Sequence, residues 1–335
     1  MVFTWILYIC CLIVVFFAAS RIAGIIDELD KKTKLSGAFL GSVLLAGVTS
    51  LPELVTSVTG AVIGEANMTL GNILGSNVFD IAIIGVLMVV FCARISHKHL
   101  SRSNIVFAAF TFIISILVLV CMIFGLEIVI PGVNINVLTP IIVLLYGLAL
   151  YSTRKEEPKV DDAEKTDAPN RFKDYSVKKL WLLFSLFSVA LVCVSIGITF
   201  LTQNIADTYS LGKGLAGALF LGVATSLPEI IASVQLIRLG NFDAAYGDII
   251  GSCLFNFGII SLADIIYTSG TVFVADTQSL VLSACLSVAA LLMCVFGIIR
   301  RKAKMIKNSK AVQLCFGVGI TVCYITFLVI STIFL

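Results

Sequence analysis

The chain has 335 residues, of which 59% are hydrophobic and 13% are charged, and its formal net charge is +3. This composition excludes a soluble cytosolic enzyme, because the apolar residues suffice for about ten spans of ~20 residues across a ~30 Å hydrocarbon core. The basic residues lie in short loops and form no continuous patch, so we expect no nucleic-acid partner. The lipid bilayer is the expected surrounding.

Ten apolar runs follow one another along the chain. Lipid offers no hydrogen-bond partner to backbone N–H and C=O groups, and a helix satisfies these groups internally. The runs are too long and too uniformly apolar for barrel strands. The runs cover residues 4–24, 36–62, 68–92, 105–124, 137–152, 180–203, 214–238, 243–266, 278–299 and 311–335. We therefore predict an all-α polytopic membrane protein with ten transmembrane helices.

A charged segment divides these runs into five and five. Residues 153–179 hold eight basic and seven acidic residues with two prolines, which predicts a solvated linker between a first half, 1–152, and a second half, 180–335. If the N-terminus lies outside, every Lys and Arg except Lys213 falls on the cytoplasmic side. We expect a plasma (inner) membrane protein with both termini outside and the linker in the cytoplasm.

Residues 41–85 and 217–261 are two copies of one pattern that align without a gap. An offset of 176 residues relates Thr49 to Thr225 and Glu53 to Glu229, and the motif TSLPE occurs in full in both copies. Because each half contributes an odd number of spans, the second copy must enter the membrane from the opposite side. Inverted repeats of this kind are typical of secondary transporters, whose halves exchange conformations.

The two copies also carry the polar residues of the spans. Pro52 and Pro228 interrupt their helices and free backbone carbonyls that can bind a cation. The oxygen-bearing side chains are Thr49, Ser50, Glu53, Ser76, Asn77 and Asp80 in the first copy, and Thr225, Ser226, Glu229, Ser252 and Asn256 in the second. Oxygen donors without a His or Cys cluster favour Ca²⁺, Na⁺ or Mg²⁺ over zinc or copper.

The cost of burying acids in lipid indicates a function for three of these residues. Each of Glu53, Asp80 and Glu229 costs on the order of 3 kcal/mol at the centre of a span. Since the spans offer no Lys or Arg to pair with them, cations are the natural partners. Asp248, which aligns with Asn72, is a further candidate that lies early in its span and is expected to cap the helix or to line the cytoplasmic entrance.

The twin TSLPE motifs, followed by GSNVFD and GSCLFN, resemble the α-repeats of the cation/calcium exchanger superfamily, in its sodium/calcium exchanger branch. The resemblance implies that Glu53 and Glu229 coordinate Ca²⁺ and share ligands with Na⁺. It also implies assisting roles for the side chains of Thr49, Thr225, Ser76 and Ser252 and for the backbone carbonyls of Ala46 and Gly222.

The sequence departs from the pattern of this family at two positions. Members whose second repeat ends its motif in Asp commonly have Asn in the first, whereas here the first repeat has Asp80 and the second has Asn256. Three central negative charges are kept, potassium dependence is not expected, and the ion held on each side stays open. Cys253 replaces the Asn that Asn77 would predict, and we expect it to be a packing residue, because a thiol is a poor ligand for hard cations.

Taken together, these features predict a secondary antiporter that exchanges Ca²⁺ for Na⁺ by alternating access, with no cofactor and no required protein partner. H⁺ stays open as the counter-ion, because a carboxylate can trade a proton for a cation. A passive cation channel is a remote alternative. An intramembrane hydrolase is not expected, because the motifs HExxH, GxSxG and GxGD are all absent.

Overall fold

The computed structural model describes residues 2–96, 100–125, 128–130, 135–153, 170–208, 225–273, 277–302 and 309–334. This part of the chain is helical, and its one β-bridge, between Val129 and Asn136, lies outside any strand. Gly222 and most of the predicted linker 153–179 lie outside the described residues. The predicted all-α fold class is confirmed.

Seven helices of the described chain are long and apolar enough to cross a membrane, and one bent pair of helices makes up to eight. The seven are α1 (Val2–Lys32), α5 (Ala66–Val90), α7 (Arg102–Ile123), α9 (Val177–Thr208), α12 (Phe242–Ile266), α13 (Thr277–Lys302) and α14 (Ser309–Phe334). Two shorter helices, α8 (Leu138–Ser152) and α11 (Leu227–Arg238), occupy the remaining predicted runs. A polytopic helical architecture is confirmed, while the count of ten spans stays a prediction.

The bent pair falls on the predicted run 36–62 and is more irregular than we expected. It consists of α2 (Gly37–Phe39), a π-helix η1 (Leu40–Leu45), α3 (Ala46–Thr49) and α4 (Leu51–Val62). The two parts meet at an angle of 47°, next to Pro52, which has no N–H to continue the hydrogen-bond ladder. The predicted break is confirmed, whereas the π-helix was not predicted.

Helix α1 continues well beyond the predicted run 4–24. Its last turns contain ion pairs at helical spacing, with Lys31 Nζ 2.6 Å from Asp27 Oδ2 and Lys32 Nζ 3.5 Å from Glu28 Oε2. Oppositely charged residues four apart stabilise a helix, so the charged segment extends α1 instead of ending it.

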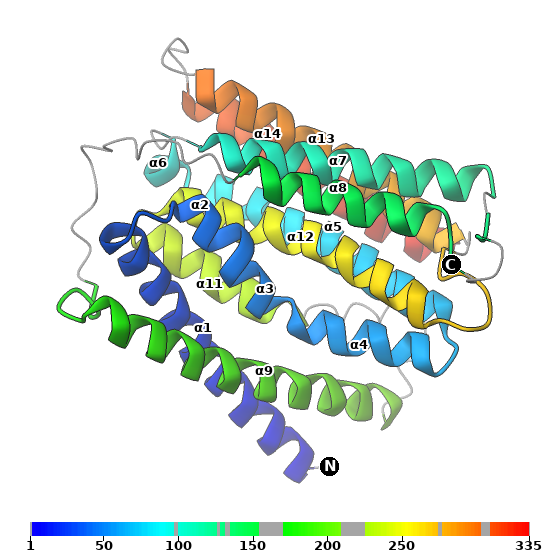
Figure 1. The fold of residues 1–335 in the computed structure, drawn as a ribbon, viewed down its shortest axis with the longest axis horizontal. Coiled ribbons are helices and arrows are strands. Elements are labelled where there is room, and N and C mark those ends of the chain that lie inside the picture. The colour runs from blue at the N-terminus through cyan, green and yellow to red at the C-terminus, as the bar shows by residue number, and fades with distance from the viewer. Residues whose placement is uncertain are drawn as a thin grey trace.

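Helices α5 and α12 lie in the centre of the bundle and run in opposite directions (Figure 1). Helices α1 and α9 pack together on one side, and α7, α8, α13 and α14 lie on the other. Helix α5 packs on α13 and α14, while α12 contacts η1, α4, α7 and α8. The two helices that carry the second half of each repeat are therefore enclosed by the rest of the chain.

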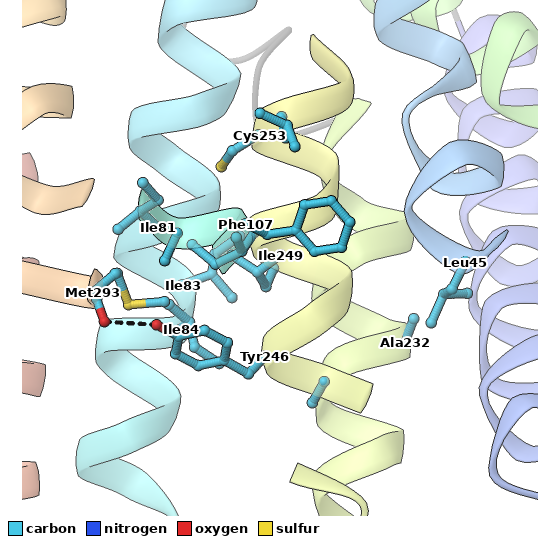
Figure 2. Packing of buried hydrophobic residues seen from close by; sticks show 14 of the residues in the cluster. Leu45, Ile81, Ile83, Ile84, Phe107, Ala232, Tyr246, Ile249, Cys253 and Met293 are labelled. Atoms are coloured by element: carbon cyan, nitrogen blue, oxygen red, sulfur yellow. Dashed lines mark hydrogen bonds between the residues drawn. The ribbon is translucent and has the colours of Figure 1, made fainter. Parts of the chain in front are cut away.

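A dense apolar core surrounds these central helices (Figure 2). Ile81 and Ile84 of α5, and Tyr246 and Ile249 of α12, are completely buried. The Tyr246 hydroxyl donates to the Met293 carbonyl of α13 at 2.7 Å, which satisfies the polar tip of a buried ring. Packing of this kind fixes the positions of the polar residues on α5 and α12.

Two glycines allow η1 and α12 to touch backbone to backbone. A Cβ added at Gly251 would lie 2.2 Å from the Ser42 carbonyl oxygen, and one added at Gly41 would lie 2.3 Å from the Ala244 carbonyl oxygen. Only residues without a side chain fit such an approach. The contact brings the segment just before the first TSLPE motif against α12.

One end of the bundle gathers basic residues, and we call it the basic end. It carries Lys31, Lys32, Arg94, Arg238 and Arg300 at helix termini, and it lies on the left in Figure 1, at α6 (Cys92–Ile95). The buried Arg300 guanidinium donates to the carbonyls of Ile95, at 2.7 Å, and Ser96. These bonds join the end of α13 to the end of α6.

A buried carboxylate organises the opposite end. Asp264, near the end of α12, accepts hydrogen bonds from Asn136 N at 2.9 Å and Thr139 Oγ1 at 2.6 Å. It also accepts from Thr271 Oγ1 at 2.9 Å and Val272 N at 3.0 Å. One side chain therefore joins the start of α8 to the loop that follows α12.

Candidate cation-binding site

The two TSLPE motifs fold into the same local structure. Ser50 has φ −88° and ψ 9°, and Ser226 has φ −85° and ψ 7°. In both motifs the serine carbonyl accepts a 3.2 Å hydrogen bond from a backbone N–H four residues on, and the proline lies within the first two residues of the new helix. Glu53 and Glu229 therefore lie in the first turns of α4 and α11, where the helix dipole favours negative charge.

Equivalent residues of the two repeats meet where α5 crosses α12. Asn77 Nδ2 donates to the Cys253 carbonyl at 3.2 Å, and Cys253 Sγ donates to the Asn77 carbonyl at 3.7 Å. In this exchange each residue contacts its own counterpart in the other repeat. Asn256 Nδ2 also donates to Asn77 Oδ1 at 2.8 Å. Cys253 is buried, as expected of a packing residue.

Hydroxyl groups of the first repeat reach carboxylates of the second. Ser50 Oγ lies 3.4 Å from Glu229 Oε1, and Thr49 Oγ1 lies 3.5 Å from Asp248 Oδ1. The Ala46 carbonyl, a predicted ligand, accepts from Ser50 N at 3.0 Å and from Thr49 Oγ1 at 3.3 Å. The structure therefore brings together candidates that lie half a chain apart in the sequence.

The central carboxylates are buried beside one another. Glu53, Asp80 and Glu229 are each 1% exposed, and Asp248 is fully buried. Asp80 lies within electrostatic range of Glu53 and Asp248. Glu229 lies within electrostatic range of Glu53, Asp80 and Asp248. The salt bridges of the described chain join only Lys31 and Lys32 to carboxylates of α1. Like charges have thus been gathered without a basic side chain to balance them.

Many oxygens of this cluster have no hydrogen-bond partner among the described residues. They are Glu53 Oε1 and Oε2, Asp80 Oδ1, Glu229 Oε2, Ser76 Oγ, Ser226 Oγ, Ser252 Oγ and Asn256 Oδ1. The Thr225 side chain interacts with the Glu53 carboxylate, and the Ser226 side chain with the Asp80 carboxylate. A buried polar atom left without a partner costs about 1–3 kcal/mol, so this cluster is suited to bind a ligand that accepts electron pairs.

Within the described part of the chain, no three His, Cys, Asp or Glu side chains converge closely enough to hold a metal ion by themselves. Ca²⁺ takes about 6–8 oxygen ligands from carboxylates, carbonyls and hydroxyls or water. Hydroxyl, amide and carbonyl oxygens would therefore have to complete any cation shell at this position.

The expectation for Asp248 as a helix cap is wrong. Helix α12 is capped by Asn241, whose side chain accepts from Ala244 N at 3.2 Å, and Asp248 lies further along the helix, in the buried cluster. Ser233 Oγ donates to Asp248 Oδ2 at 3.3 Å. Our sequence reasoning missed Ser233, although the repeat offset pairs it with Ser57, which accepts from Asn72 Nδ2 at 2.9 Å.

The chain matches one family model and is similar to several known proteins. The family model described as "Sodium/calcium exchanger protein" matches residues 3–154 and 179–333. The inner membrane protein YrbG of Escherichia coli (strain K12) is 22% identical over 265 residues, which are 78% of this chain and 79% of that protein. CaxA of Alkalimonas amylolytica, whose name describes an antiporter, is 24% identical over 247 residues, 73% of this chain and 75% of that protein.

A solved structure has the same fold. The sodium-calcium exchanger NCX_Mj, soaked with Na⁺ and Sr²⁺, superposes with a TM-score of 0.73 at 17% sequence identity. The match covers 98% of this chain and 99% of that one.

Proposed function

Because this chain belongs to the sodium/calcium exchanger family, we propose that it is a secondary antiporter that exchanges Ca²⁺ for Na⁺ across the membrane by alternating access. Like the exchangers it matches, the chain is a multi-pass membrane transporter and not an enzyme. Ca²⁺ and Na⁺ are its cargo in this proposal, and no cofactor takes part.

The observation that carries the proposal is the group of buried carboxylate and hydroxyl oxygens without partners at the two helix breaks. Glu53, Glu229 and Asp80 would supply the negative charge, and the neighbouring hydroxyl, amide and carbonyl oxygens would complete the shell. If the same oxygens hold either Ca²⁺ or Na⁺, an empty carrier keeps unpaired charges in a low dielectric and resists changing sides. That resistance would make exchange obligatory.

The proposal includes ten spans in two inverted halves, 1–152 and 180–335. The reciprocal bonds between Asn77 and Cys253 support it, because each residue contacts its own counterpart when two repeats are related by a two-fold axis. The matching backbone angles of Ser50 and Ser226 support it as well. With two interchangeable halves, one state opens to one side of the membrane and its counterpart to the other.

We further propose that the protein lies in the plasma (inner) membrane, with the basic end in the cytoplasm and both termini outside. The gathering of Lys and Arg at one end of the bundle supports this orientation. The name of the E. coli relative, an inner membrane protein, supports the location.

The test is Ca²⁺ uptake by proteoliposomes under an imposed Na⁺ gradient. Glu53→Gln and Glu229→Gln should each lower Na⁺-dependent uptake by roughly 100-fold, because each removes a charge from the site. Glu65→Gln is the matched control, since Glu65 is an exposed carboxylate in the turn between α4 and α5. Robust flux in both site variants would end the assignment.

The counter-ion is decided by imposing Na⁺ and pH gradients separately, with wild-type protein and with Asp80→Asn. Ca²⁺ movement that follows the Na⁺ gradient alone supports the proposal. Movement driven by the pH gradient without Na⁺ would replace it with Ca²⁺/H⁺ exchange, and Ca²⁺ flux that needs neither counter-ion would indicate a channel.

A further inference from the structure

The contact between Asn77 and Cys253 marks the level at which α5 and α12 cross, and the central acids can be placed relative to it. Asp80 lies three residues after Asn77, toward α6, and Asp248 lies five residues before Cys253, toward the helix start at Asn241. With a rise of ~1.5 Å per residue, these positions are about 4.5 Å and about 7.5 Å from the crossing. Because the helices are antiparallel, both acids lie on the side of the basic end.

Their repeat counterparts are amides, and these lie on the other side of the crossing. Asn256 follows Cys253 by three residues, and Asn72 precedes Asn77 by five. Asn72 Nδ2 donates to Ser57 Oγ at 2.9 Å and reaches the Glu53 carbonyl at 3.4 Å. At two positions one repeat has an acid where the other has an amide. At both of them the acid lies in the half of the site nearer the basic end.

The half of the site nearer the basic end also contains buried oxygens without hydrogen-bond partners among the described residues. Asp80 Oδ1 and Ser226 Oγ each lack a hydrogen-bond partner among the described residues, and the Ser226 side chain lies close enough to interact with the Asp80 carboxylate. Asp248 lies within electrostatic range of Asp80, and its oxygens are 3.5 Å from Thr49 Oγ1 and 3.3 Å from Ser233 Oγ. Two carboxylates that share a space with inward-facing hydroxyls are the ligands that a hard divalent cation prefers.

We propose that Asp80 and Asp248, together with the Ser226 hydroxyl, form a Ca²⁺ subsite in the half of the pathway nearer the basic end. Asp248 is the specificity-determining residue of this subsite, because it adds a fourth carboxylate to the central three and places it on one side only. The subsite gives the two access routes unequal affinity for Ca²⁺. This inference rests on the proposed antiport function.

Equilibrium Ca²⁺ binding to the purified, full-length protein tests the subsite without relying on transport. Asp248→Asn gives this position the amide of its repeat counterpart, Asn72, and should weaken Ca²⁺ binding by about tenfold. Asp243→Asn is the control: Asp243 is a partly buried carboxylate of α12, and it is held by Ser101 N and Asn104 Nδ2, each at 2.8 Å. Equal Ca²⁺ affinity in Asp248→Asn and wild type would overturn the proposal.

Sidedness is measured with everted and right-side-out membrane vesicles. Asp248→Asn should raise the Ca²⁺ concentration for half-maximal transport by about tenfold at the face of the basic end and by no more than about twofold at the other. The single variant Asn72→Asp, which keeps Asp248, should tighten Ca²⁺ at the opposite face. Equal shifts at both faces would contradict an asymmetric subsite.

The outcomes separate this inference from the proposed function. If wild-type protein neither binds nor exchanges Ca²⁺, the antiport assignment fails and the subsite with it. If Glu53→Gln abolishes exchange while Asp248→Asn behaves like wild type, only the subsite fails.

Discussion

Asp264 and Glu53 are both buried carboxylates, but their surroundings differ completely. Asp264 is fully buried and receives four hydrogen bonds of 2.6–3.0 Å. Glu53 is 1% exposed, and neither of its oxygens has a hydrogen-bond partner among the described residues. The difference teaches that burial alone does not identify a functional acid, since the protein satisfies one charge and leaves the other for a ligand.

The physical cause is the kind of donor that each position offers. At Asp264, two loops supply backbone N–H groups and threonine hydroxyls that point inward. Around Glu53 the neighbours are other carboxylates and the Thr225 side chain, and the Thr49 hydroxyl bonds to helix carbonyls at Leu45 and Ala46. The hydroxyls that remain at the centre, such as those of Ser76 and Ser252, form no hydrogen bond among the described residues, which suits a site that must bind and release cations.

The largest expected effect tests the structural side of this comparison. Asp264→Asn should lower the free energy of unfolding by about 3 kcal/mol, because an amide nitrogen then faces hydrogen-bond donors and the charge-assisted bonds are lost. Thermal unfolding in detergent measures it. A variant as stable as wild type would show that the four bonds around Asp264 add little.

The functional side is tested by ligand-dependent stability. Ca²⁺ at 100 times its dissociation constant should stabilise wild-type protein by about 2.7 kcal/mol, as any ligand of the folded state does. Glu53→Gln should lose this stabilisation by Ca²⁺. Asp264→Asn should keep it, although the variant is less stable than wild type without Ca²⁺. If Ca²⁺ stabilised Glu53→Gln as much as wild type, the distinction between the two carboxylates would be wrong.

The smallest effect concerns the protein without added Ca²⁺ or Na⁺. Replacing an unpartnered buried charge by a neutral amide removes a desolvation cost, so Glu53→Gln should be more stable than wild type by about 1 kcal/mol. Glu65→Gln, at an exposed position, should change stability by less than about 0.5 kcal/mol. Chemical unfolding of the three proteins side by side measures the difference, and a clear loss of stability in Glu53→Gln would mean that its carboxylate has a structural partner.

Much of the site followed from the repeat. The shared TSLPE motif predicted two helix breaks, and the structure has near-identical backbone angles at Ser50 and Ser226. The offset also paired Asn77 with Cys253, which meet at the crossing of α5 and α12. These predictions succeeded because a proline break is local and because equal sequences fold alike.

Asp248 and Asp264 could not be assigned in this way. Position along the helix suggested a cap for Asp248, and Asp264 drew no attention near the end of an apolar run. Their roles depend on Thr49, which reaches Asp248 from the other half of the chain, and on loop donors that reach Asp264. Neither partner has a spacing that sequence reasoning can recognise.

By itself, the sequence determined that this chain is a helical membrane protein, where its helices break, and which acids are too costly to bury without a purpose. Those properties follow from hydropathy, proline chemistry and a repeated pattern, all of which are read along one dimension. The tertiary structure alone decided which acids are satisfied and on which side of the crossing each one lies. That decision depends on the antiparallel packing of α5 and α12, which brings together residues about half a chain apart.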